Sequence, residues 1–135
     1  MIYEVKQAIA NKIKEVYPNA TIYDEDIPQG FKDGSFLISV IDGTYKKSID
    51  NRFSGSVSFD IAYFPESSDT LKNECYQVAQ NMLRAFDLLN NSHRTNDKNF
   101  NITDDVLHIL FTVKYREIKT EIGVKMSNIH FAHYE

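Results

Sequence analysis

The chain has 135 residues and a mass of 15.6 kDa, which is the size of one ordinary domain. Its 42% hydrophobic residues, with 8 Tyr and 9 Phe, exclude disorder over most of the length. Its formal net charge of -4 excludes a chain-wide positive field that would attract the phosphates of nucleic acids. We therefore expect a single domain over residues 1–135 that binds no nucleic acid specifically.

The lone cysteine and the N-terminal segment bear on cellular location. Cys75 lies at an apolar position of a helical pattern, which predicts a buried thiol in a reducing compartment. Charges are distributed through the N-terminal segment, and no stretch of the sequence has the length and apolarity of a signal peptide or a membrane span. These features predict a soluble protein that is made in the cytoplasm and has no membrane partner.

The first expected element is an amphipathic helix that begins at Ile2 and ends at Tyr17, before Pro18. Its apolar residues recur at spacings of three and four, which places them on one stripe. They are Ile2, Val5, Ile9, Ile13 and Val16. A short strand is expected next, over residues 20–24.

An acidic connector, "YDEDIPQGFKDGSF" at residues 23–36, leads to the following strand. Consecutive acids on an extended segment point to opposite sides, and the spacing is not that of a calcium loop. Pro28 restricts the residue before it to an extended form, and Gly30 permits a turn. Phe31 is expected to anchor the far end. We therefore interpret the segment as structural, with acids that face solvent, a neighbouring subunit or a lumen.

Two strands are expected over residues 35–41 and from Arg52 onward. In the second strand, apolar and small polar residues alternate, which is typical of a half-buried antiparallel strand. The apolar set is Phe53, Val57, Phe59, Ile61 and Tyr63. Asp42-Gly43 is the stronger hairpin turn signal between the strands and Asp50-Asn51 the weaker one, so the register stays open. We place a hairpin loop over residues 42–51.

Lys46, Lys47 and Arg52 form a basic cluster at this loop, beside Tyr45. A basic tip with apolar neighbours suits an acidic partner surface. A solvated hairpin that is kept soluble by its lysines explains the cluster equally well. The sequence leaves both interpretations open.

A second helix is expected over residues 71–89, ending at Asn90-Asn91. Its apolar stripe consists of Leu71, Cys75, Val78, Met82, Phe86 and Leu89. The remaining chain predicts a hairpin around Asp104-Asp105. That turn places Ile102 opposite Leu107 and Phe100 opposite Ile109, so that apolar residues share one face.

The expected order is helix, strand, strand, strand, helix, strand, strand. Two helices with one apolar stripe each, and a sheet with one apolar face, predict an α+β domain. It has two layers, with a mainly antiparallel sheet and both helices packed on one face. Residues 1–118 form this core, and residues 119–135 form a C-terminal strand or arm.

Residues with catalytic or metal-binding potential are present but are not grouped in a known motif. The enzymatic alternative is a small metal-dependent hydrolase that uses Asp24, Glu25 and Asp26, with Asp60 or His108. His108 lies on the strand face opposite the core and is expected to be exposed. We expect no catalytic residue, no metal site and no cofactor.

Aromatic residues are too numerous for one small core, which favours an oligomeric interface over scattered surface positions. The aromatic residues in question are Tyr3, Tyr23, Phe31, Tyr45, Phe64, Tyr76, Phe100 and Tyr134.

Three stretches in this order, "IYDEDIPQGFKDGSFLISV", "RFSGSVSFDIAYFP" and "DDVLHILFTVKY", resemble the tail terminator family of phages and prophages of Gram-positive bacteria. The resemblance covers roughly residues 1–118. Its most characteristic connector positions are Tyr23, Glu25, Gln29 and Gly30. The chain departs from the family pattern at Asp104-Asp105, where an Asp-Gly turn is more typical, and in its C-terminal segment.

The resemblance implies a non-enzymatic virion protein at the head-tail junction, assembled in the cytoplasm of the host bacterium. Such proteins form a ring, usually of six copies, that caps the finished tail tube, stops its polymerisation and offers a surface to the head connector. The implied partners are further copies of the chain, the tail tube protein and the head connector or another neck protein, while DNA only passes through the ring. Another neck or head-completion role is the alternative. The interface candidates are Tyr23, Glu25, Gln29, Gly30, Phe31, Tyr45, Lys46, Lys47 and Arg52.

Overall fold

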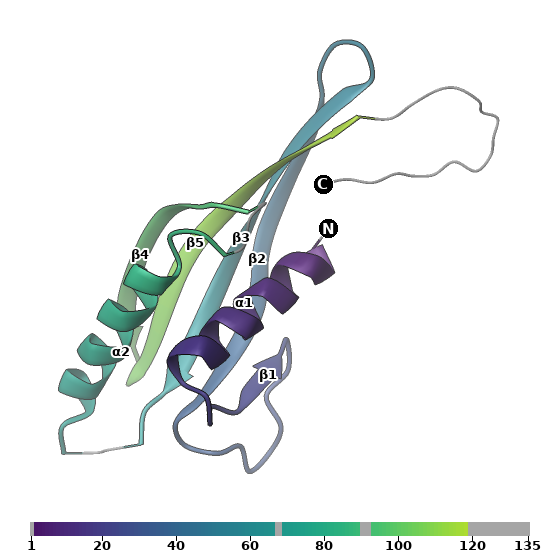
Figure 1. Cartoon of the computed structure of the whole chain (residues 1–135). Coiled ribbons are helices and arrows are strands. Elements are labelled where there is room, and N and C mark those ends of the chain that lie inside the picture. Colours follow the sequence, from purple (N-terminus) through teal and green to yellow (C-terminus); the bar gives the residue numbers. More distant parts are fainter. Residues whose placement is uncertain (1, 67–68, 90–92, 119–135) are drawn as a thin grey trace.

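The computed structural model describes residues 2–66, 69–89 and 93–118, which hold two helices and five strands (Figure 1). In chain order they are α1 (Ile2–Val16), β1 (Ile22–Asp24), β2 (Ser35–Lys47), β3 (Arg52–Phe64), α2 (Leu71–Ala85), β4 (Thr95–Thr103) and β5 (Val106–Ile118). The predicted order of elements is confirmed. The strand or arm predicted for residues 119–135 lies outside the described residues.

The five strands form one sheet in the order β1-β2-β3-β5-β4. β1 runs parallel to β2, and the other neighbouring pairs are antiparallel. The parallel pair arises because the connector carries the chain back along the sheet before β2 begins. The predicted α+β class with a mainly antiparallel sheet is confirmed.

The core lies between the helices and one face of the sheet. The register places Phe59 of β3 between Val40 of β2 and Phe111 of β5, so the alternating apolar residues of the three strands share that face. Both helices contribute to the same buried cluster, for example through Ile9 and Met82. Figure 1 shows α1 and α2 on the same side of the sheet. Because each fully buried side chain of this kind contributes about 1.5–3 kcal/mol, the core fixes the strand register.

The β2–β3 hairpin turns at Asp50-Asn51, so the predicted loop over residues 42–51 is wrong. Asp50 and Asn51 have φ angles of 58° and 62°. Arg52 N donates to Ile49 O at 3.2 Å, which closes a turn of type I′. The weaker of the two sequence signals therefore forms the turn.

Asp42-Gly43, the stronger signal, lies inside β2 beside a bulge. Pairing continues beyond it until Lys47 lies opposite Phe53. The longer ribbon gains further ladder hydrogen bonds and a stack of the Tyr45 and Phe53 rings, whose centroids are 5.3 Å apart. These contacts outweigh the local turn preference of Asp-Gly.

The β4–β5 hairpin turns at Asp104-Asp105, as predicted, with φ angles of 52° and 63°. Ile102 lies opposite Leu107 and Phe100 opposite Ile109, so the predicted register is confirmed. Phe100 nevertheless remains 41% exposed, because β4 is an edge strand of the sheet.

α2 ends at Ala85, earlier than the predicted end at residue 89. Phe86 and Leu89 are still buried, as their place in the apolar stripe predicts, but they follow the helix. Leu88 instead pairs with Arg94 in an isolated bridge, so the chain reverses toward β4.

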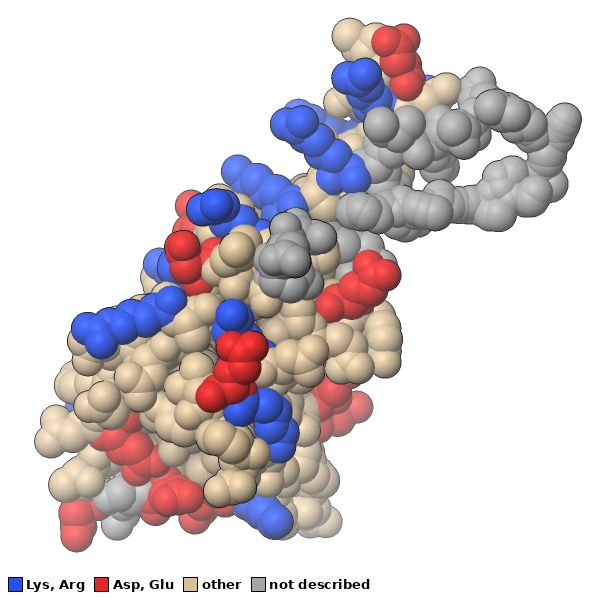
Figure 2. All heavy atoms as spheres, viewed as in Figure 1, with Lys and Arg blue, Asp and Glu red and all other residues tan. Residues whose placement is uncertain are grey.

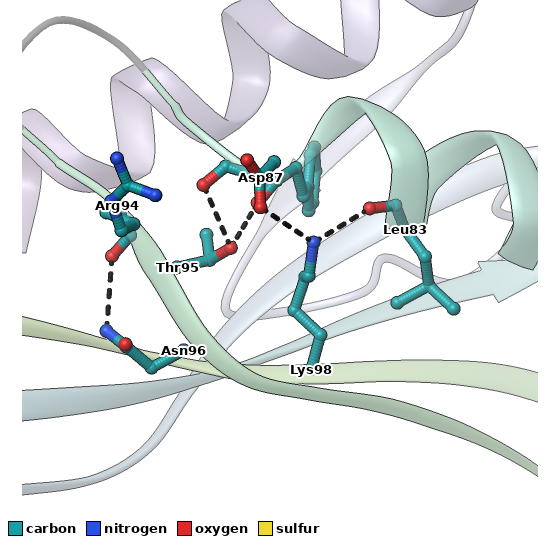
Figure 3. A network of polar contacts seen from close by, with 7 residues as sticks. Leu83, Asp87, Arg94, Thr95, Asn96 and Lys98 are labelled. Atoms are coloured by element: carbon teal, nitrogen blue, oxygen red, sulfur yellow. Dashed lines mark hydrogen bonds and ion pairs between the residues drawn. The ribbon is translucent and has the colours of Figure 1, made fainter.

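Polar side chains of β4 bind the carbonyl groups at this end of α2 (Figure 3). Lys98 Nζ donates to Leu83 O at 3.1 Å and pairs with Asp87 Oδ1 at 3.4 Å. Thr95 Oγ1 donates to Phe86 O and, at 3.4 Å, to Asp87 O. A helix end leaves carbonyls without intrahelical partners, and β4 supplies those partners here. This is the physical reason for the early end of the helix.

Candidate functional site

The acidic connector is bound to α1 by a lysine. Lys6 Nζ lies 2.8 Å from Asp24 Oδ1 and 2.6 Å from Glu25 Oε2. Val40 N also donates to Glu25 Oε2, at 3.3 Å. Burial lowers the pKa of Lys6, but the hydrogen bonds and charges of the two acids outweigh it and leave the pKa above its ordinary value. Asp24 and Glu25 thus hold edge strand β1 to the helix, while both acids remain exposed to solvent as expected.

The rest of the connector also makes contacts within the chain. Tyr23 Oη accepts a hydrogen bond from Lys32 N at 3.3 Å. Phe31 packs on Phe64 with ring centroids 4.8 Å apart, so it anchors the far end as predicted. Gly30 has a φ of 74°, which confirms the predicted turn, and Gln29 beside it is exposed. The connector is structural, and its interface role stays a prediction.

β2, β3 and β5 continue past the helices as a three-stranded ribbon, here named the basic extension (residues 41–58 and 114–118; Figure 1). β1 pairs with β2 only as far as Ile38, and β4 pairs with β5 only as far as Val113. Among the described residues, both edges of the ribbon therefore lack a partner strand. Open edges of this kind are surfaces to which another chain can add.

The outer face of the basic extension carries a row of cations. Lys46 lies opposite Ser54, and Ser54 lies opposite Arg116, so both cations stand in one row across the three strands. Lys114 lies in the next row, opposite Ser56. Lys47 and Arg52 are also exposed, so the exposed cations of the extension are Lys46, Lys47, Arg52, Lys114 and Arg116. Asp42 and Asp50 are exposed acids of the same extension.

Aromatic side chains lie on the other face of the basic extension, and an exposed isoleucine lies at its turn. Tyr45, stacked on Phe53, is 51% exposed, and Ile49 at the turn is 77% exposed. Tyr115 covers Gly55: a Cβ there would lie 2.6 Å from the Tyr115 ring. The extension thus combines positive charge with apolar surface outside the core.

The opposite end of the sheet is acidic. We name it the acidic edge, and it consists of Asp33, Glu66, Asp69, Asp104 and Asp105, all exposed. These acids lie in three segments: the connector, the segment between β3 and α2, and the β4–β5 turn. The segments are adjacent, because Gly34 N bonds Phe64 O at 2.6 Å and because Asp69 and Asp105 line one hollow. Lys32 and Lys72 lie in the same region, so acids outnumber cations there without excluding them.

Figure 2 shows this division of charge on one face of the molecule. Lys and Arg gather along the extension, and several Asp and Glu gather at the other end. The interface candidates divide in the same way. Tyr23, Glu25, Gln29, Gly30 and Phe31 lie in the connector, while Tyr45, Lys46, Lys47 and Arg52 lie in the extension. The structure does not bring the two groups together.

Groups that the hydrolase alternative requires are not assembled. Within residues 2–66, 69–89 and 93–118, no three His, Cys, Asp or Glu side chains are grouped so that they could hold a metal. His108 Nδ1 pairs with Asp60 Oδ2 at 3.0 Å on the outer sheet face, and both side chains are half-buried, which corrects the expectation that His108 is exposed. Cys75 is fully buried as predicted, and burial raises the pKa of its thiol.

The described residues form a two-layer α+β domain with an extended, open-edged ribbon and oppositely charged ends. The chain belongs to the phage tail terminator protein family, whose model matches residues 4–125. Membership implies a component of the virion tail and suggests a non-enzymatic role. A search among curated proteins gave no match. No helix in the described ranges is long and apolar enough to cross a membrane.

Lys114 and Arg116 are the members of the basic row that sequence reasoning missed. Lys114 sits between Val113 and Tyr115, and Arg116 lies two residues further along the same alternating strand, so the sequence assigns both to the outer face. Their position beside Lys46 depends on the pairing of β3 with both β2 and β5. Strand alternation was the available signal, but it does not say which strands are neighbours.

Proposed function

We propose that this chain is a tail terminator that closes into a ring on the end of the finished tail tube. The ring stops further addition of tube subunits and gives the head connector or another neck protein a surface to bind. The number of copies implied by the family resemblance is six. The observation that carries the proposal is the family match over nearly the whole chain.

The surfaces of the described residues support assembly. Closed rings are built from two different patches of each subunit, which meet by rotation about one axis. The chain offers such patches at opposite ends, and it offers unpaired ribbon edges as well. Tyr3 and Tyr76 add exposed aromatic surface, being 70% and 50% exposed. Tyrosine is enriched at protein interfaces, since it joins apolar area to a hydroxyl group.

In this proposal the protein does not catalyse a reaction or hold a cofactor. Its partners are copies of itself, the tube protein and the neck, and it sits at the head-tail junction of the virion after assembly in the host cytoplasm. DNA passes through the ring without specific binding. The net negative charge of the chain supports that passage, because like charge weakens attachment of the DNA backbone to the wall.

Tube growth in vitro tests the proposal. The tube protein of the same phage is polymerised with increasing amounts of this protein, and tube lengths and ends are recorded by electron microscopy. We expect shorter tubes with extra density at one end and growth that stops at saturation. Tubes of unchanged length with bare ends would contradict the terminator role. Binding to the connector without binding to tubes would instead favour another neck role.

A further inference from the structure

The two charged surfaces of the chain are held apart by the sheet itself. β2 starts at Ser35, beside the acidic edge, and reaches Lys46 in the basic extension. At a rise of about 3.3 Å per residue, these positions are on the order of 35 Å apart. The cations of the extension therefore cannot contact the acidic edge of their own chain. β2 thus runs from beside the acidic edge to the cations of the basic extension (Figures 1 and 2).

We propose that the basic extension of one copy docks on the acidic edge of the next copy, and that this contact joins neighbouring subunits. The inference rests on the proposed ring and names the contact that closes it. The two patches differ, so the contact is heterologous and can propagate head to tail around a ring. A two-fold dimer through either patch would place like charges together, which is unfavourable.

The occupant is a second copy of the chain because the complementary surface is present on the chain itself. Lys46, Lys114 and Arg116 also line a shared hollow with Tyr115, which could receive acidic side chains. A nucleic-acid backbone would match the charge alone. It offers no apolar surface to Tyr45, which lies on the ribbon face opposite Lys46, or to Ile49 at the turn, although both are exposed. A protein edge can cover both the charges and these side chains.

Charge and apolar contact play different parts in this interface. Exposed ion pairs contribute little individually and are screened by salt, so the cations chiefly set the orientation of the subunits and the rate of their encounter. Burial of Tyr45 and Ile49 supplies attraction that salt does not screen. We therefore expect the rate of assembly to fall as salt rises. Contacts between subunits that have already formed are expected to persist.

Charge reversal at each end tests the docking. The extension variant carries Lys46→Glu, Lys114→Glu and Arg116→Glu, and the edge variant carries Asp33→Lys, Glu66→Lys and Asp69→Lys. All six positions are exposed, and unchanged melting temperatures would show that both variants fold. Native mass spectrometry, and sedimentation with tube ends, measure assembly of each variant alone and of a 1:1 mixture.

Each variant alone has two ends of the same sign, so we expect at least a tenfold loss of assembly. In the mixture, each negative extension meets a positive edge and each wild-type extension meets a wild-type edge. We therefore expect the mixture to regain assembly, with the two variants alternating and only even-numbered rings closing. Normal assembly of either variant alone would overturn the proposal. So would a mixture that stays as defective as its components.

A cysteine pair gives a second readout that does not depend on charge. Lys46→Cys and Asp69→Cys are combined with Cys75→Ser, and the assembled protein is oxidised. We expect a ladder of covalent multimers from the double-cysteine protein and no ladder from either single-cysteine protein. Products that stop at dimers would contradict a head-to-tail contact.

The controls separate this inference from the proposed function. Wild-type protein that fails to stop tube growth would refute the terminator role. Wild-type protein that caps tubes, with variants that assemble equally well, would refute only the docking. A gel-shift measurement with double-stranded DNA tests nucleic acid as the alternative partner. An extension variant that assembles normally but loses salt-sensitive DNA binding would assign the extension to nucleic acid. That result would overturn the proposal.

Discussion

The Tyr63 hydroxyl donates a 2.6 Å hydrogen bond to Glu74 Oε2, which joins the C-terminal end of β3 to the first turn of α2. The same oxygen accepts Glu66 N at 2.8 Å. Tyr63 is buried, so the bond is shielded from water. We expect Tyr63→Phe to lower the free energy of unfolding at neutral pH by about 2 kcal/mol, the range for a hydrogen bond to a charged group. Urea unfolding of the wild type and the variant measures this difference in the free energy of unfolding.

The same bond should show a pH dependence. Burial raises the pKa of Tyr63, and the Glu74 hydrogen bond and charge raise it further above the ordinary value of 10.0. A group whose pKa is raised in the folded state stabilises that state fully below its unfolded pKa, and the contribution is lost as pH rises. The stability gap between wild type and Tyr63→Phe should therefore shrink above about pH 10. A gap that widens between pH 8 and pH 11 would contradict this assignment.

Removal of the clamp between α1 and the connector should have a modest effect. Lys6→Met leaves Asp24 and Glu25, whose side chains are 63% and 43% exposed, to be hydrated. We expect a loss of about 1 kcal/mol in the free energy of unfolding, which diminishes in high salt. Lys12→Met is the matched control on the same helix, because Lys12 pairs at 3.6 Å only with Glu15 of α1 among the ion pairs described. Equal effects of the two substitutions would contradict a role of the clamp in holding β1.

The junction of α2 and β4 depends on Thr95, which is buried. Thr95→Val keeps the shape of the side chain but leaves the carbonyls of Phe86 and Asp87 without its hydroxyl. We expect a loss of about 1–3 kcal/mol and faster amide exchange at the end of α2. Thr103→Val, at the exposed end of the same strand, is the control and should change stability little. Unchanged exchange in the Thr95 variant would argue against this account of the helix end.

Gly55 is expected to be required for the basic extension. In Gly55→Ala, the new Cβ would lie 2.5 Å from Thr44 O and 2.6 Å from the Tyr115 ring, so backbone and ring must shift. We expect a weakened ribbon, faster amide exchange over residues 44–57 and poorer tube capping. Ser54→Ala, its neighbour on the outer face, should leave the exchange unchanged. A Gly55 variant with wild-type exchange would contradict the close packing described.

The sequence by itself determined the order of helices and strands and which residues face the buried side of the sheet. The apolar spacings and Pro18 predicted an end of α1 at Tyr17, one residue beyond its end at Val16, and the alternation in β3 assigned Phe59 and its neighbours to the core. The β4–β5 register also followed from sequence, because a two-residue turn at Asp104-Asp105 and the apolar pattern required the same pairing. These features depend on residues close together in the chain, where turn geometry and periodicity are sufficient.

Tertiary structure decided the features that depend on distant residues. The β2–β3 turn lies at Asp50-Asn51 because the ladder, the Tyr45–Phe53 stack and the neighbouring β5 favour a long ribbon over the locally stronger Asp-Gly turn. α2 stops early because Thr95 and Lys98 arrive from β4. Of the family's connector residues, Glu25 binds Lys6 and Tyr23 accepts a hydrogen bond from Lys32 N.

The candidate docking surfaces show most clearly what the sequence alone does not predict. Composition gives a net charge of -4, but it does not say that cations from three strands collect at one end and acids from three segments at the other. Lys46 and Arg116 become neighbours only when β3 lies between their strands. Charge segregation is a property of strand order, and strand order was set by the burial of the apolar face, to which these charged residues contribute nothing.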